Sequence, residues 1–177
     1  MKDFFSKYKH IFSRGFSFIE MMIYASILAL MFISVVNVLV VMGRSYGSFR
    51  SASYVVQSGE TALNRIITEV RKAESIDLAG STLDSNPGIL KINTFDDGGS
   101  PKTVLFRVSE GVVWLDENGT PSGRLTHSDV EVSNLIFRRI ETPISEGVKI
   151  ELEVTSDLSG TTTAKNFYGS AIMRNSY

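Results

Sequence analysis

An uncharged run over residues 21–42 constrains this chain more than any other feature of its sequence. Aliphatic, aromatic and methionine residues make up most of the run, and its most polar members are Ser26, Ser34 and Asn37. A helix of about 20 apolar residues crosses the hydrocarbon core of a bilayer. A helix on the surface of a soluble protein would instead show a polar face. The run therefore predicts a membrane-spanning helix, in which Asn37 suits hydrogen bonding between helices.

The segment in front of this run is basic. Residues 1–15 contain Lys2, Lys7, Lys9 and Arg14 against one acid, Asp3, so their net charge is +3. A positive flank predicts that the N-terminus stays in the cytoplasm and that the chain beyond residue 42 lies outside it. A removable secretory signal also begins with basic residues, but its apolar core has about 7–15 residues and ends at a small-x-small site. The longer run favours a retained helix.

Glu20 is the only charged residue between Phe16 and the end of the apolar run. A carboxylate at the edge of the hydrocarbon is costly unless it is paired or held at the interface, so Glu20 is either a functional residue or an interfacial anchor. A basic leader ending in Gly15, then Phe16, Glu20 and a long apolar helix resembles the type IV prepilins and type II secretion pseudopilins. Their usual motif is Gly-Phe-Thr-Leu-Ile-Glu, and residues 15–20 read Gly-Phe-Ser-Phe-Ile-Glu.

The resemblance implies a processing and assembly pathway. A prepilin peptidase would cut after Gly15 on the cytoplasmic side, and the new N-terminus at Phe16 would be N-methylated. Glu20 would then pair with the N-terminal amine of a neighbouring subunit in a filament. The electrostatics agree, because an opposite charge lowers the cost of keeping either group in lipid. Gly15 agrees too, because a residue without a side chain lets the backbone enter a protease cleft.

Beyond the run, the helical pattern becomes amphipathic. The spacing places most of the apolar residues of this stretch on one face of the expected helix; these residues are Val56, Leu63, Ile66, Ile67, Val70 and Ile76. Arg65, Glu69 and Lys72 follow one another at spacings of four and three, which suits the solvated face.

Three glycines interrupt the same stretch. Gly43, Gly47 and Gly59 each weaken a helix by about 1 kcal/mol relative to alanine. A helix that is continuous to Ile76 and a helix that bends or melts at these glycines both remain open.

The pattern changes from helical to alternating after Gly80 and residues 86–88. Strands are expected around residues 90–93, 104–108, 112–115, 130–140, 148–155 and 164–174, with a hairpin at 109–111 and a turn at 116–119. A long helix followed by antiparallel strands predicts an α+β fold, with the sheet against helix residues 63–76.

The chain therefore divides into four expected parts. They are a leader at 1–15, a transmembrane and assembly helix at 16–42, an amphipathic continuation at 43–79 and a β-rich extracytoplasmic head at 80–177. In this layout, the helix positions Leu63, Arg71, Ala73 and Glu74 and the C-terminal stretch at 173–175 most resemble the J-type minor pseudopilins and related minor pilins.

Residues suited to catalysis or metal binding are few. The chain has no cysteine and two histidines. His10 falls in the leader, and His127 stands beside Ser128 and Asp129, where a polar turn is favoured because catalytic triads are assembled from separated elements. The acidic loops at 96–99 and 116–119 lack the EF-hand spacing for Ca²⁺. We expect no enzyme activity, no metal site and no cofactor.

Three functions fit these observations unequally. The first is a pilin-like structural subunit of a type II secretion pseudopilus or type IV pilus, in the cytoplasmic membrane before assembly, with prepilin peptidase, other pilin or pseudopilin subunits and lipid as partners. The second is a minor pilin of a DNA-uptake or adhesive filament. The third is a membrane-anchored hydrolase, for which the sequence offers no convergent set of acid and base residues. Removing the +3 leader from a chain of net charge −1 leaves −4, so no nucleic-acid partner is expected.

Overall fold

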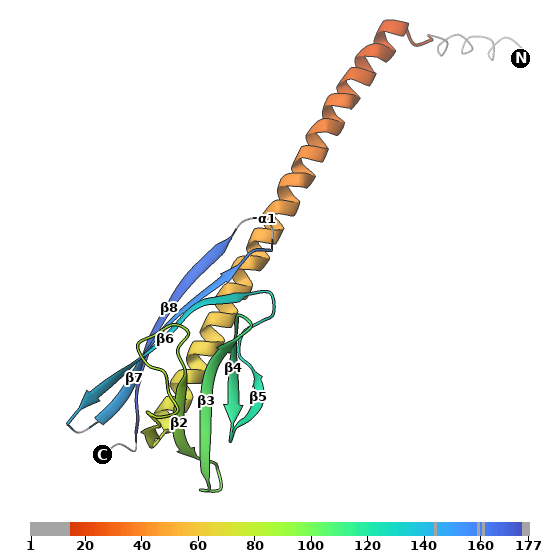
Figure 1. Ribbon diagram of the computed structural model, residues 1–177. Coiled ribbons are helices and arrows are strands. Elements are labelled where there is room, and N and C mark those ends of the chain that lie inside the picture. Colours follow the sequence, from red (N-terminus) through yellow and green to blue (C-terminus); the bar gives the residue numbers. More distant parts are fainter. Residues whose placement is uncertain (1–14, 144, 159, 161, 175–177) are drawn as a thin grey trace, which may run out of the picture. The chain divides into compact units, whose positions relative to one another are not determined.

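A computed structural model describes residues 15–143, 145–158, 160 and 162–174 of the protein (Figure 1). The leader positions 1–14, including His10, and residue 175 lie outside the described residues. The chain forms two compact units, Met1–Gly43 and Arg44–Tyr177.

One helix, α1 (Phe18–Lys72), provides all the helical structure of the described residues. The Met21 amide donates to the Ser17 carbonyl at 3.2 Å, which closes its first turn. Acidic Glu20 in the first turn, and Arg71 and Lys72 in the last, complement the helix dipole. The helix continues through Gly43, Gly47 and Gly59. The sequence left open whether the helix bends or melts at these glycines, and the structure shows that it is unbroken there.

The predicted C-terminal limit of the helix is wrong by four residues. The helix ends at Lys72, and Ile76 belongs to a short strand, β1 (Ser75–Ile76). Pairing of Ser75 with Asn93 and of Ile76 with Ile92 places these residues in a sheet. Tertiary pairing therefore overrides the local helical pattern at residues 73–76.

The first sheet is antiparallel and has the order β1-β2-β3-β4-β5. Its other strands are β2 (Leu90–Phe95), β3 (Pro101–Ser109), β4 (Val112–Glu117) and β5 (Thr120–Arg124). The expected hairpin turns at Glu110-Gly111, and Asn118-Gly119 forms the next turn, with all four residues at positive φ. The predicted turn at 116–119 is thus too wide, because residues 116 and 117 still belong to β4 and pair with residues 105 and 104 of β3. Strand β5 was not predicted.

The second sheet consists of three long antiparallel strands in the order β6-β7-β8. They are β6 (Glu131–Thr142), β7 (Ser145–Ser156) and β8 (Thr163–Ile172). The predicted alternation along β7 is confirmed, since Val148, Ile150, Leu152 and Val154 are all buried. The side chains between them are less buried, as period-two patterning requires.

Side chains from both sheets and from the second part of α1 form one hydrophobic core. The α+β fold is therefore confirmed, with two sheets in place of the single expected sheet. On the helix, Ile66 and Val70 are buried as predicted, while Leu63 and Ile67 pack partly buried against the core. Glu69, predicted to lie on the solvated face, is instead only 5% exposed.

Candidate functional site

The predicted cleavage position lies in open chain just before α1. Gly15, Phe16 and Ser17 are not helical and are exposed, and a Cβ at Gly15 would meet no atom within 4 Å. The Phe16 ring is 68% exposed and lies edge-on to the Tyr24 ring at a centroid distance of 6.0 Å. The peptide bond between Gly15 and Phe16 is therefore sterically accessible to a protease.

Glu20 lies in the first turn of α1 and is partly exposed. The Tyr24 hydroxyl, one helical turn away, donates a hydrogen bond to Glu20 Oε1 at 3.3 Å. Within residues 15–174, as far as they are described, no basic side chain forms an ion pair with Glu20. Among the described residues this carboxylate has apolar neighbours and no countercharge, and a cation from elsewhere would stabilise such an arrangement.

The apolar side chains that follow Glu20 are exposed in the isolated chain. From Met21 to Met42 the large hydrophobic residues are between 42% and 70% exposed. The helix is long and apolar enough to cross a membrane. These side chains thus need lipid or other helices around them to be removed from water.

The other residues considered for catalysis or metal binding have structural roles. The His127 ring stacks on Tyr54 at 4.7 Å, and its Nδ1 accepts a hydrogen bond from the Asp129 amide at 3.2 Å. Asp96 Oδ1 accepts from the amides of Gly98 and Ser100 at 2.9 and 2.8 Å, which is ordinary turn chemistry. Among the described residues, no group of three or more metal-ligating side chains is found.

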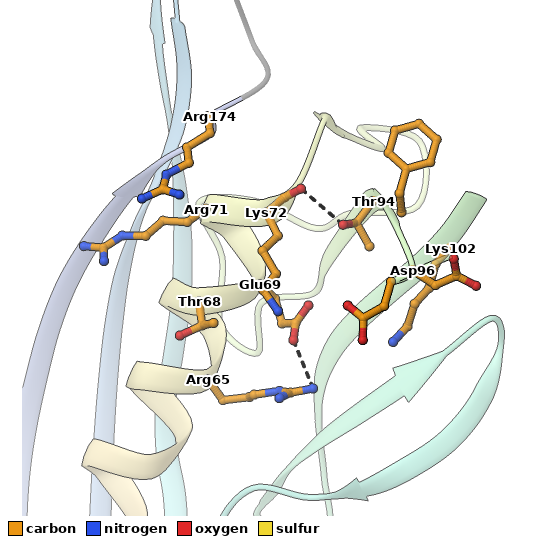
Figure 2. Close-up of a pocket in the computed structure, with 11 residues that line it drawn as sticks. Arg65, Thr68, Glu69, Arg71, Lys72, Thr94, Asp96, Lys102 and Arg174 are labelled. Carbon is orange, nitrogen blue, oxygen red and sulfur yellow. Dashed lines mark hydrogen bonds and ion pairs between the residues drawn. The ribbon is translucent and has the colours of Figure 1, made fainter. Parts of the chain in front are cut away.

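One hollow of the head is a cleft of about 680 Å³ that we call the basic cleft. It lies beside the last two turns of α1, the turn between β2 and β3, and Arg174, two residues after β8 (Figure 2). Its basic side chains are Arg65, Arg71, Lys72, Lys102 and Arg174, and its acidic ones are Glu69, Asp96 and Asp97. The lining therefore has an excess of positive charge.

Ion pairs neutralise only part of this charge. Arg65 pairs with Glu69 at 2.9 Å, and Lys102 pairs with Glu117 at 2.8 Å. In the described part of the chain, Arg71, Lys72 and Arg174 have no carboxylate partner. Figure 2 shows Arg71 and Arg174 on one wall, opposite Asp96 and Lys102. The backbone joins the two arginines, because the Arg174 amide donates to the Arg71 carbonyl at 3.3 Å.

Sequence reasoning did not find the basic cleft. Arg71 and Arg174 are far apart in the sequence and meet only because β8 ends beside the end of α1. No spacing rule links such positions, so the pattern of either segment alone carries no signal of the cleft.

Comparisons with models of known protein families, with curated proteins and with solved structures found no match.

Proposed function

We propose that this chain is a pilin-like structural subunit of a type II secretion pseudopilus or type IV pilus. Its apolar helix is held in the cytoplasmic membrane with the head outside the cytoplasm, and is later withdrawn into a filament. The observation that carries the proposal is Glu20, a carboxylate that has no countercharge among the described residues. It lies at the start of an exposed apolar helix, four residues after Phe16, and the Gly15–Phe16 bond lies in exposed chain.

The chemistry of assembly follows from cleavage. Cutting after Gly15 releases an amine at Phe16, and N-methylation leaves that amine protonated. The amine of one subunit then meets Glu20 of a neighbour, so each buried charge gains a partner as the helices pack. Packing the apolar side chains against one another keeps the helices out of water once they leave the bilayer. No step requires a metal or a catalytic residue of this chain.

The second candidate is a minor pilin whose head binds a ligand in a DNA-uptake or adhesive filament. The basic cleft favours it, because a ligand with negative charge would complement Arg71, Lys72 and Arg174. The side chains after residue 15 carry a net charge of −4, counting from the chain's total of −1, and this disfavours nucleic acid as the ligand. Both candidates share the same processing and helix packing.

The test of the proposed function is the mass of the processed N-terminus. The full chain is co-expressed with a prepilin peptidase and analysed by intact mass spectrometry. We expect a chain that begins at N-methylated Phe16, and Gly15→Leu should block the cut because its side chain obstructs the protease cleft. A chain that keeps residue 1, or one cut after residue 42, would refute the pilin-like assignment.

A further inference from the structure

A second hollow of the head has the opposite charge to the basic cleft. This hollow, which we call the acidic end, is a cleft of about 620 Å³. The charged residues of its lining are all acidic: Glu110, Asp129, Glu131 and Asp157. His127 Nδ1 lies 3.6 Å from Asp129 Oδ2. Within the described ranges, Glu110, Glu131 and Asp157 have no ion-pair partner.

The two charged surfaces lie at opposite ends of the same head. Strand β3 begins next to Lys102 in the basic cleft and ends next to Glu110 at the acidic end. At about 3.3 Å per residue, these two positions are about 26 Å apart. Strand β8 also runs between the two surfaces, because Thr162 precedes it at the acidic end and Arg174 follows it in the basic cleft.

We propose that the heads of two copies of this chain dock end to end, with the acidic end of one copy in the basic cleft of the next. The proposal deepens the proposed function, on which it rests, by naming a head-to-head contact within the filament. Because the two surfaces differ and lie at opposite ends, the contact is heterologous and repeats in one direction. A contact of this kind builds an open filament instead of a closed pair.

A second copy fits the basic cleft better than nucleic acid does. Asp96 stands on the wall opposite Arg71 and Arg174 and Asp97 also lines the cleft, so a continuous polyanion would meet both signs of charge. The acidic end instead brings separate carboxylates that can pair locally with Arg71, Lys72 and Arg174. Exposed ion pairs contribute little individually, so the contact depends on the high local concentration of heads whose helices share one membrane or filament.

Cysteine crosslinking between differently tagged full-length copies tests this contact. The chain contains no cysteine, so Thr68→Cys in the basic cleft and Ser128→Cys at the acidic end provide unique positions. With a short bifunctional maleimide, in membranes, we expect a crosslink between the two copies. The yield should fall at least fivefold between 50 and 500 mM salt, because salt screens exposed charges.

Charge reversal makes the test specific. Arg71→Glu with Arg174→Glu reverses the cleft, and Glu110→Lys with Glu131→Lys reverses the acidic end. Either reversal present in both copies should lower crosslinking at least fivefold, because like charges then face each other. A reversed cleft paired with a reversed acidic end should restore at least half the original yield. Glu60→Lys with Glu153→Lys is the matched control, outside both clefts, and should leave the yield unchanged.

Several outcomes would overturn the proposal. The proposal is wrong if the crosslinking yield stays at the wild-type level after either reversal. It is also wrong if the yield falls and the combination of both reversals does not restore it. If a chain with these reversals fails to fold, the test is repeated with Lys72→Glu to reverse the basic cleft and Asp157→Lys to reverse the acidic end. A labelled single-stranded DNA oligonucleotide that binds the wild type but not the reversed cleft, without any crosslink between copies, would assign the cleft to nucleic acid. Cleavage is not needed for crosslinking, so an uncut chain would refute the proposed function separately.

Discussion

Gly59 of α1 faces the aromatic ring of Phe167 of β8, so closely that a Cβ at position 59 would overlap the ring carbons. The Lys165 ammonium also lies over this ring, 5.3 Å from the ring centroid. Gly59 is therefore the point at which the second sheet approaches the helix backbone. Its cost to helix stability is offset by this close packing.

Substituting Gly59 by alanine should destabilise the head. Overpacking of this kind costs about 1–3 kcal/mol, which exceeds the gain of about 1 kcal/mol in helix propensity. Thermal unfolding of the full chain in detergent, followed by circular dichroism, should show a lower midpoint. Gly43→Ala is the control, because a Cβ there would meet nothing within 4 Å. A midpoint for Gly59→Ala at or above that of the wild type would contradict this packing role.

The role of Gly59 shows what the sequence of the helix did not reveal. Local propensity identified the glycine as a weak point, but its purpose depends on Phe167, more than a hundred residues later. The alternation in β7 was predictable because one face of the strand is buried and the other is not. The short strands β1 and β5 were not predictable from such a pattern, because β1 has only two residues and β5 is polar and mostly exposed.

Buried Glu69 should depend on Arg65 for its countercharge. Arg65 Nη2 lies 2.9 Å from Glu69 Oε1, and the Glu69 side chain is 7% exposed. Arg65→Met should lower the free energy of unfolding by about 1–3 kcal/mol, because a buried acceptor loses its partner. The double variant Arg65→Met with Glu69→Leu should recover most of this loss, since no buried charge remains. A double variant no more stable than Arg65→Met would show that the pair is not the cause.

The burial of Glu69 was wrongly predicted for a related reason. Its spacing from Arg65 and Lys72 is that of a solvated ion-pair series, and helical spacing alone gives no sign of what lies opposite. In the structure, Glu69 lines the basic cleft together with residues 94–97, at the end of β2 and in the following turn, which are distant from it in the sequence. The proposed cleavage residues Gly15 and Phe16 and the proposed assembly residue Glu20, by contrast, lie close together in the sequence, so a short motif is enough to predict them; their roles stay a prediction.

Glu151 should make the stability of the second sheet depend on pH. Its carboxylate lies 3.0 Å from Lys149 Nζ and 3.2 Å from Arg138 Nε. Hydrogen bonds from Lys149 and then Arg138 lower the pKa of Glu151 below its ordinary value. A lowered pKa in the folded state stabilises the fold above the unfolded-state pKa, and this contribution is lost as the pH falls through the folded-state pKa.

The comparison of wild type with Glu151→Gln checks this dependence. At pH 7 the wild type should be the more stable chain in urea unfolding, and the difference should shrink towards zero in strong acid. A difference that stays constant from pH 7 to pH 2 would mean that ionisation of Glu151 does not contribute.

The pairing of Glu20 with the amine of a neighbouring subunit is the central claim, and Glu20→Gln tests it. The variant keeps the shape of the side chain and removes only its charge. Leaving one member of a buried pair without its partner costs about 3–5 kcal/mol. That cost is large enough to keep a subunit in the bilayer. Tyr24→Phe is the matched control, because it removes the hydrogen bond to Glu20 and leaves the carboxylate.

The decisive measurement is the amount of each variant in filaments sheared from cells, set against the amount processed and retained in the membrane. We predict that Glu20→Gln is cut after Gly15 and stays in the membrane but is absent from filaments, while Tyr24→Phe assembles like the wild type. Incorporation of Glu20→Gln at the wild-type level would contradict the pairing and leave Glu20 as an anchor of the helix at the membrane surface.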